Sequence, residues 1–191
     1  MSVYRFSKTY YRSTPVQFLL EEGRPTVGGF GVIHVPGHCP GQVCLLVDDV
    51  LLTADHVLSR ITPHQAPESI TLNMGLGHYL DALGKVAALP GVRLGLGGHE
   101  DPIDDIPGRV AAIRAAHAER LGKIIDICRT PKSIAEISRE LFGRVDSYHV
   151  LLALEETGAH VEYLHQRGEL MAANLEEIEA MSHPVVRYVC E

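Results

Sequence analysis

Hydrophobic and polar positions alternate in short runs over the first hundred residues. The runs bounded by turn residues predict strands over residues 16–20, 30–35, 43–47, 50–53 and 92–96. Asp48 and Asp49 separate the third and fourth runs, which therefore predict a β-hairpin. Residues 79–89 have helical spacing instead. Strands that alternate with a helix predict an α/β domain.

The second half of the chain has a different pattern. It predicts helices over residues 106–129, 131–142 and 147–157, then a hairpin of residues 161–166 and 169–172. Thr130 is the expected cap of the second helix, and Gly158 is the expected end of the third. Three helices followed by a hairpin are typical of a winged helix. Residues 175–191 match no pattern.

Composition excludes several classes of protein. The chain has 191 residues, 46% of them hydrophobic and 21% charged, which is typical of a globular protein. Its net charge of −7 argues against a general role at nucleic acid or membrane surfaces. The first eleven residues lack the apolar stretch of an export signal, and the four cysteines form no C-x-x-C pair. We therefore expect a cytoplasmic protein with free thiols.

Three residues of metal-ligand type follow strand-like runs. His38 lies in the turn Pro-Gly-His-Cys-Pro-Gly, Asp55 follows the second strand of the hairpin, and His99 follows two glycines. A catalytic metal is typically held by imidazole and carboxylate groups and keeps one position open for water. Because all three residues follow strand ends and lie at turns, we expect His38, Asp55 and His99 to converge in space.

In this order, the three segments resemble the C-terminal half of the metallo-β-lactamase hydrolase family. Residues 106–172 are similar to a winged-helix module that follows this fold in some hydrolases. The resemblance divides the chain into a partial metallo-β-lactamase-like domain (1–105), a winged-helix-like domain (106–172) and a C-terminal tail (173–191). It implies an α/β fold, half of an αββα sandwich, with the winged helix attached.

The resemblance also implies the chemistry. It makes His38, Asp55 and His99 metal ligands, with Asp55 bridging two ions and serving as the catalytic carboxylate. The implied cofactor is zinc, or iron or manganese, as one or two ions. The implied substrate is a small ester or thioester attacked by metal-bound hydroxide.

One part of the family's site is absent from these 191 residues. The family's first motif, His-x-His-x-Asp-His, does not occur, and Asp55-His56 does not replace it because Leu51 and Thr53 stand where histidines should be. The sequence therefore predicts an incomplete site that binds metal weakly. Three hypotheses remain: a hydrolase fragment with little activity, a site completed by another segment or chain, and an interaction module.

The expected partners follow from charge and from the half-sandwich. Between Arg109 and Leu170, nine basic residues balance nine acidic ones, and the expected recognition helix carries Glu155 and Glu156. This pattern argues against nucleic-acid binding, although a ribonuclease-like hydrolase stays an alternative. No membrane role is expected. We expect a homo-oligomer or a partner to cover the apolar face that half a sandwich leaves open.

Overall fold

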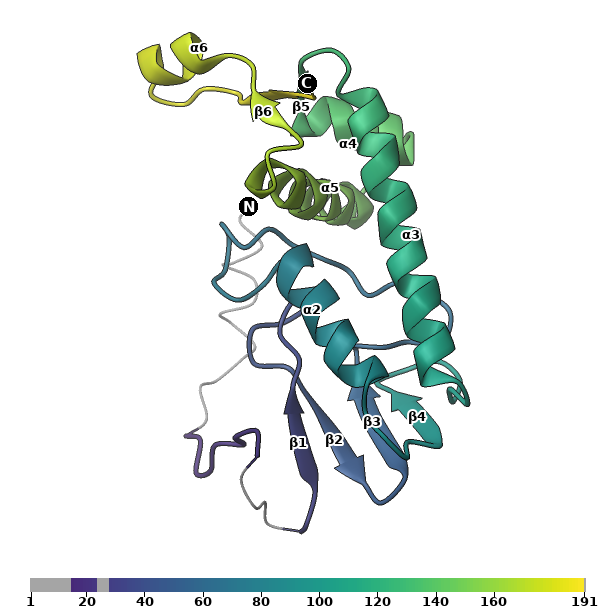
Figure 1. Ribbon diagram of the computed structural model, residues 1–191. Coiled ribbons are helices and arrows are strands. Elements are labelled where there is room, and N and C mark those ends of the chain that lie inside the picture. Colours follow the sequence, from purple (N-terminus) through teal and green to yellow (C-terminus); the bar gives the residue numbers. More distant parts are fainter. Residues whose placement is uncertain (1–14, 24–27, 191) are drawn as a thin grey trace.

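The computed structural model describes residues 15–23 and 28–190 (Figure 1). A four-stranded sheet with α2 packed on it lies at one end of the molecule, and a group of helices lies at the other. The elements of the sheet unit are β1 (Gly31–His34), β2 (Val43–Val47), β3 (Val50–Ala54), α2 (Leu76–Ala87) and β4 (Leu94–Gly97). Those of the helical unit are α3 (Ile106–Ile127), β5 (Lys132–Ser133), α4 (Ile134–Phe142), α5 (Tyr148–Gln166), β6 (Met171–Ala172), α6 (Leu175–Ala180) and β7 (Arg187–Val189).

The sheet has the strand order β1-β2-β3-β4. β2 is antiparallel to both β1 and β3, and β4 is parallel to β3. The predicted α/β architecture is confirmed, since these strands and α2 lie where the sequence places them, within a few residues at each end. The carboxyl ends of β1, β3 and β4 consequently lie at one edge of the sheet, where their arrowheads point in Figure 1.

Only one face of the sheet faces a hydrophobic core among the described residues. Ile33, Cys44 and Leu51 lie on that face and pack with Tyr79 of α2 and Ile113 of α3. The opposite face carries aliphatic side chains that belong to neither core, of which Val32 is only 6% exposed: Val32, Leu45, Val47, Val50, Leu52, Leu94 and Leu96. Leu52 is 38% exposed, so this face is apolar and partly open to solvent.

Helix α3 joins the two units. Its first half packs on the sheet unit through Ile106 and Ile113, and its last turn contributes Ile124 to a second core with Ile137 and Leu164. A 22-residue helix is about 33 Å long, enough to reach both cores. The boundary expected at residues 105 and 106 thus falls at the start of a helix that serves both units.

The start of α4 differs from the prediction. The helix begins at Ile134 with Ser133 as its cap, rather than at Pro131 with Thr130 as its cap. Ser133 Oγ accepts from the backbone N–H of Glu136, and the Glu136 carboxylate accepts from the N–H of Ser133. This capping box satisfies two backbone donors at once, which a cap at Thr130 could not do because Ser133 stands three residues later in place of Glu or Gln.

The hairpin predicted at residues 161–172 is wrong in its first strand. Helix α5 continues from Tyr148 to Gln166, so residues 161–166 are helical. Gly158 does not end the helix. It makes room for Pro67, whose Cγ would lie 2.9 Å from a Cβ at this position. The glycine therefore serves the packing of a loop against α5.

The C-terminal residues, which no sequence pattern placed, contain α6 and β7. β7 lies in the middle of a small antiparallel sheet of order β5-β7-β6, and it supplies the partner of β6 that the sequence assigned to residues 161–166.

Residues 16–20, which were predicted as a strand, do not form one. Val16, Phe18 and Leu19 are each more than 70% exposed, so no packing stabilises an extended pairing there. In the described residues, no helix is long and apolar enough to cross a membrane.

Candidate metal centre

The three sequence-predicted ligands lie beyond the carboxyl ends of β1, β3 and β4. His38 follows β1, Asp55 follows β3 directly, and His99 follows β4. Because these three strands point the same way, their ends meet at one edge of the sheet. The sheet topology thus brings together residues that are far apart in the sequence.

Asp55 and His99 are in contact. Asp55 Oδ1 lies 3.7 Å from His99 Nε2, and both side chains are about half exposed, at 44% and 53%. A zinc ion lies about 2.0–2.2 Å from nitrogen and oxygen ligands. Two atoms 3.7 Å apart can therefore both bind one ion, and the pair fits as two ligands of a single metal.

The backbone around Asp55 is shaped to hold its carboxylate. The N–H of Gly98 donates to the carbonyl of Ala54 at 2.8 Å, which ties the ends of β3 and β4 together. A Cβ on residue 98 would overlap with Asp55 Oδ1, so any larger residue would displace the carboxylate from this position. In the amide orientation that satisfies its hydrogen bonds, Gln42 accepts from the N–H groups of Asp55 and His56.

His38 is oriented by a different contact. Its Nδ1 donates to the carbonyl oxygen of His64 at 2.6 Å, which leaves the lone pair of Nε2 free. Metal-binding histidines usually hold their second ring nitrogen in this way. His38 is not in the tight Asp55–His99 contact. Among the described residues, only His117, Glu156 and His160 have ligand atoms that all lie within 4.8 Å of one another.

The turn that carries His38 is held by contacts with the start of α2. Gly37 has a φ of +130°, and its carbonyl accepts from the N–H of Gly75 at 3.0 Å. Tyr79, buried in α2, donates its hydroxyl to the carbonyl of His56 at 2.9 Å. The same helix thus supports the segments that follow both β1 and β3.

Two neighbouring side chains do not fit as ligands. His56 is fully enclosed beside Tyr79 and is therefore a core residue, and this burial lowers its pKa to about 4. Partial burial and the nearby Asp55 carboxylate raise the pKa of the Cys39 thiol. A thiol that resists ionisation is a poor metal ligand.

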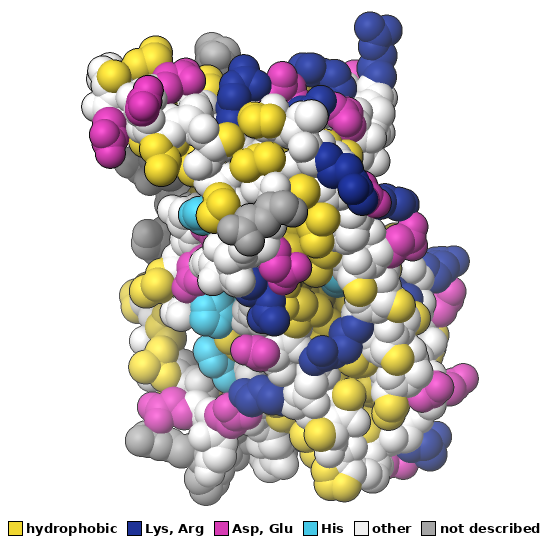
Figure 2. Space-filling view, turned by 45° about the horizontal axis from the view of Figure 1, so that its top comes forward, with side chains coloured by type: hydrophobic (Ala, Val, Ile, Leu, Met, Phe, Trp, Pro, Cys, Tyr) yellow, Lys and Arg dark blue, Asp and Glu magenta, His cyan; other side chains and the backbone are white. Residues whose placement is uncertain are grey.

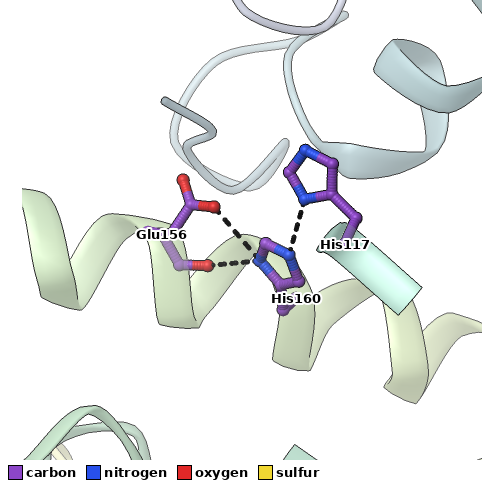
Figure 3. Close-up of side chains that lie close together, drawn as sticks. All are labelled: His117, Glu156 and His160. Carbon is purple, nitrogen blue, oxygen red and sulfur yellow. Dashed lines mark hydrogen bonds and ion pairs between the residues drawn. The ribbon is translucent and has the colours of Figure 1, made fainter. Parts of the chain in front are cut away.

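A second cluster was missed by the sequence analysis. It consists of His117 on α3 with Glu156 and His160 on α5 (Figure 3). His117 Nδ1 lies 3.0 Å from His160 Nε2, and His160 Nδ1 donates to the backbone carbonyl of Glu156 at 2.7 Å. Glu156 and His160 are four residues apart, which puts them on one helical face. The i, i+4 spacing of Glu156 and His160 gave no prediction because the predicted helix ended at residue 157, before His160.

The buried cluster has the residue types of a metal site, but the guanidinium of Arg120 already contacts it. Arg120 Nη1 lies 2.7 Å from Glu156 Oε1 and 3.3 Å from His117 Nδ1. Burial lowers the pKa of His117 to about 3 and that of His160 to about 4, so both rings are neutral. The guanidinium of Arg120 already pairs with the carboxylate that a metal would need. We therefore interpret the cluster as a hydrogen-bonded network.

No protein-family model and no curated protein matches the sequence. Among solved structures, a metallo-β-lactamase family protein from Thermus thermophilus matches with a TM-score of 0.79 and 24% identity, over 100% of this chain and 60% of that one. A β-lactamase domain protein from Burkholderia ambifaria matches with a TM-score of 0.81 and 28% identity, over 94% of this chain and 54% of that one.

The chain has a metallo-β-lactamase-like fold. This fold is of a metal-dependent hydrolase type, and the ligand types at the β1, β3 and β4 edge agree with it. The metallo-β-lactamase-like chain spans between 54% and 60% of the length of these two solved structures.

Proposed function

We propose that this chain carries part of the active site of a metal-dependent hydrolase, with His38, Asp55 and His99 as metal ligands. The contact between Asp55 and His99, in the space left by Gly98, is the observation that carries the proposal. A carboxylate and an imidazole that lie within bonding distance of one point fit zinc, iron or manganese.

Each residue has a role in this proposal. A bound metal would lower the pKa of a coordinated water to about 7 and polarise the substrate carbonyl. Asp55 would neutralise charge and bridge two ions, while His99 and His38 would bind through Nε2. His64 holds the ring of His38 through Nδ1. The substrate class that we propose is a small ester or thioester.

The proposed site needs ligands beyond these three. No His-x-His-x-Asp-His occurs in the 191 residues, and His38 lies outside the Asp55–His99 contact. A site with few ligands must order its groups when the metal binds. We therefore propose that the isolated chain binds metal weakly and that a further segment or chain completes the site.

The helical unit is proposed to be a winged helix that supports the catalytic edge. Its order of α3, β5, α4, α5, β6, α6 and β7, with β7 paired between β5 and β6, supports this assignment. Figure 2 shows basic and acidic side chains intermingled over the face that it presents, rather than a basic field. Glu155 and Glu156 face the loop of residues 63–69. These observations favour support of the site over nucleic-acid binding.

An interaction module stays the second candidate function. The start of α5 exposes a short apolar patch: Tyr148 is 60% exposed, Val150 40% and Leu151 39%. Patches of this kind are found at protein–protein contacts. A protein of this type would keep its partner when Asp55 and His99 are removed, whereas a hydrolase would lose its activity.

Metal content measured beside hydrolysis tests the proposal. The purified 191-residue chain should hold less than one metal per chain by elemental analysis and should not turn over generic esters or thioesters. Fusing a segment that bears His-x-His-x-Asp-His should restore both. Asp55→Ala in the fused protein should abolish both, and Asp104→Ala, an exposed carboxylate elsewhere, should change neither.

Two results would contradict the proposal in different ways. Two tightly held metals and robust turnover in the 191-residue chain alone would disprove the incomplete site. Metal that survives Asp55→Ala but is lost in His160→Ala would place the ion in the buried cluster instead.

A further inference from the structure

Three glutamates on α5 hold the loop of residues 63–69. Glu155 Oε2 lies 3.0 Å from His64 Nε2, and Glu156 Oε2 accepts from the backbone N–H of Gln65 at 2.7 Å. Farther along, the carboxylate of Glu162 accepts from the N–H groups of Glu68 and Ser69 at 2.6 and 3.0 Å. Carboxylates of the helical unit thus hold both ends of a loop of the sheet unit.

The same loop carries the group that orients His38. The carbonyl oxygen of His64 accepts the hydrogen of His38 Nδ1, and His64 is bonded in the chain to Gln65, whose N–H is held by Glu156. Two hydrogen bonds therefore connect Glu156 to the ring of His38, and the peptide group between His64 and Gln65 joins them. Neither α5 nor Glu156 needs to reach the metal edge itself.

Glu156 is the fixed point of this arrangement. Its side chain is only 9% exposed, and its two oxygens face different partners. Oε1 pairs with Arg120 of α3 at 2.7 Å, while Oε2 receives the Gln65 N–H and also lies 3.4 Å from His64 Nδ1. Glu155 and Glu162 are more exposed, so the loop is held most rigidly beside His64.

We infer that Glu156 is a positioning residue for His38, acting through the backbone of His64 and Gln65, with Glu155 assisting through the His64 ring. The helical unit thereby sets the tautomer and direction of a ligand that it does not touch. This inference rests on the proposed role of His38 as a metal ligand. The orientation of its ring, however, can be measured without any metal.

The test reads the ring of His38 by NMR. Two-bond ¹H–¹⁵N correlations of the metal-free chain, recorded well above the ordinary histidine pKa of about 6.5, show which nitrogen carries the proton. The native chain should show His38 fixed with the proton on Nδ1. Glu156→Ala removes the acceptor of the Gln65 N–H, and we expect the ring to populate both tautomers.

Conservative variants separate positioning from simple stability. Glu156→Gln keeps an oxygen that can accept from Gln65, so it should return the Nδ1–H tautomer toward the native population. Glu119→Ala is the matched control on α3, because Glu119 is exposed and its ion pair, at 2.6 Å, is with Lys123. This control should leave His38 unchanged.

The outcomes decide the inference without the metal. A folded Glu156→Ala chain with an unchanged His38 tautomer would overturn it, as would an equal change in Glu119→Ala. If Glu156→Ala does not fold, Glu156→Asp takes its place, since the shorter side chain withdraws the carboxylate from the Gln65 N–H. An unchanged tautomer in that variant would also overturn the inference. A native chain that shows the fixed tautomer but binds no zinc, even when fused to the segment with His-x-His-x-Asp-His, would refute the proposed function and leave this inference intact.

Discussion

Gly37 lies directly against the backbone of Tyr79. A Cβ on residue 37 would lie 2.5 Å from the Cα, the Cβ and the backbone nitrogen of Tyr79. The turn that carries His38 is therefore seated on the first turns of α2, and the φ of +130° at Gly37 makes this approach possible.

A side chain at residue 37 should lift the turn off α2. Gly37→Ala should lower the free energy of unfolding by about 3 kcal/mol, since it combines overpacking against backbone with a strained φ. Chemical denaturation measures the change. Gly41→Ala is the control in the same turn, because nothing lies within 4 Å of a Cβ there. Equal effects of the two substitutions would contradict the seating of the turn on Tyr79.

The buried histidines should make stability fall at acid pH. Burial holds the pKa of His160 at about 4 and that of His117 at about 3, both below the ordinary 6.5. A depressed pKa gives stability that is fully present above 6.5 and is lost as pH falls through the folded-state value. For His160 this amounts to about 3 kcal/mol between pH 6.5 and 4, at about 1.4 kcal/mol per pKa unit.

A double variant checks this source of the pH dependence. His117→Leu with His160→Leu should flatten the unfolding free energy between pH 6.5 and 4, because it removes both titrating rings. Replacing both partners by apolar groups also leaves no unpaired polar atom between them. His149→Leu, at an exposed position, should keep the native slope. An unchanged slope in the double variant would show that other groups cause the acid sensitivity.

Residue 98 should control metal affinity without being a ligand. Gly98→Ala would push on the Asp55 carboxylate, so zinc affinity in the completed protein should fall between about 10- and 100-fold, as for other groups that orient ligands. Isothermal titration calorimetry measures the affinity. Gly122→Ala, in open space on α3, is the control and should bind zinc like the native chain. Native affinity in Gly98→Ala would argue against Asp55 as a ligand.

The apolar outer face of the sheet should drive association. We expect the native chain to sediment as a dimer or larger species at micromolar concentration, because exposed apolar patches of this kind are rare in monomers. Leu52→Lys, near the centre of the face, should shift the chain toward monomer. Ile70→Lys, at a residue 63% exposed outside the sheet, should not. A monomeric native chain would contradict this prediction.

The sheet unit could be predicted well because its signals are local. Each strand is a short aliphatic run between turn residues. Three residues of metal-ligand type, His38, Asp55 and His99, come after three of those runs. The common edge of their strands then follows from topology. Periodicity does not reveal the 3.7 Å approach of Asp55 and His99, since it depends on the parallel register of β3 and β4.

The helical unit was harder to predict because tertiary contacts override its local signals. Gly158 has the appearance of a helix end, yet it is kept by the approach of Pro67. The partner of β6 comes from β7, and the sequence between them contains a helix. The role of Glu156 depends on a loop some ninety residues earlier in the chain, which no local pattern can indicate.

The central position of β7 sets an order of events during synthesis. β5 and β6 each pair with β7 and not with one another, so neither strand has its partner until residue 189 has been made. The four-stranded sheet, in contrast, is complete once residue 97 has emerged. The edge that gathers Asp55 and His99 can therefore form on the ribosome well before the unit whose glutamates hold the loop behind His38.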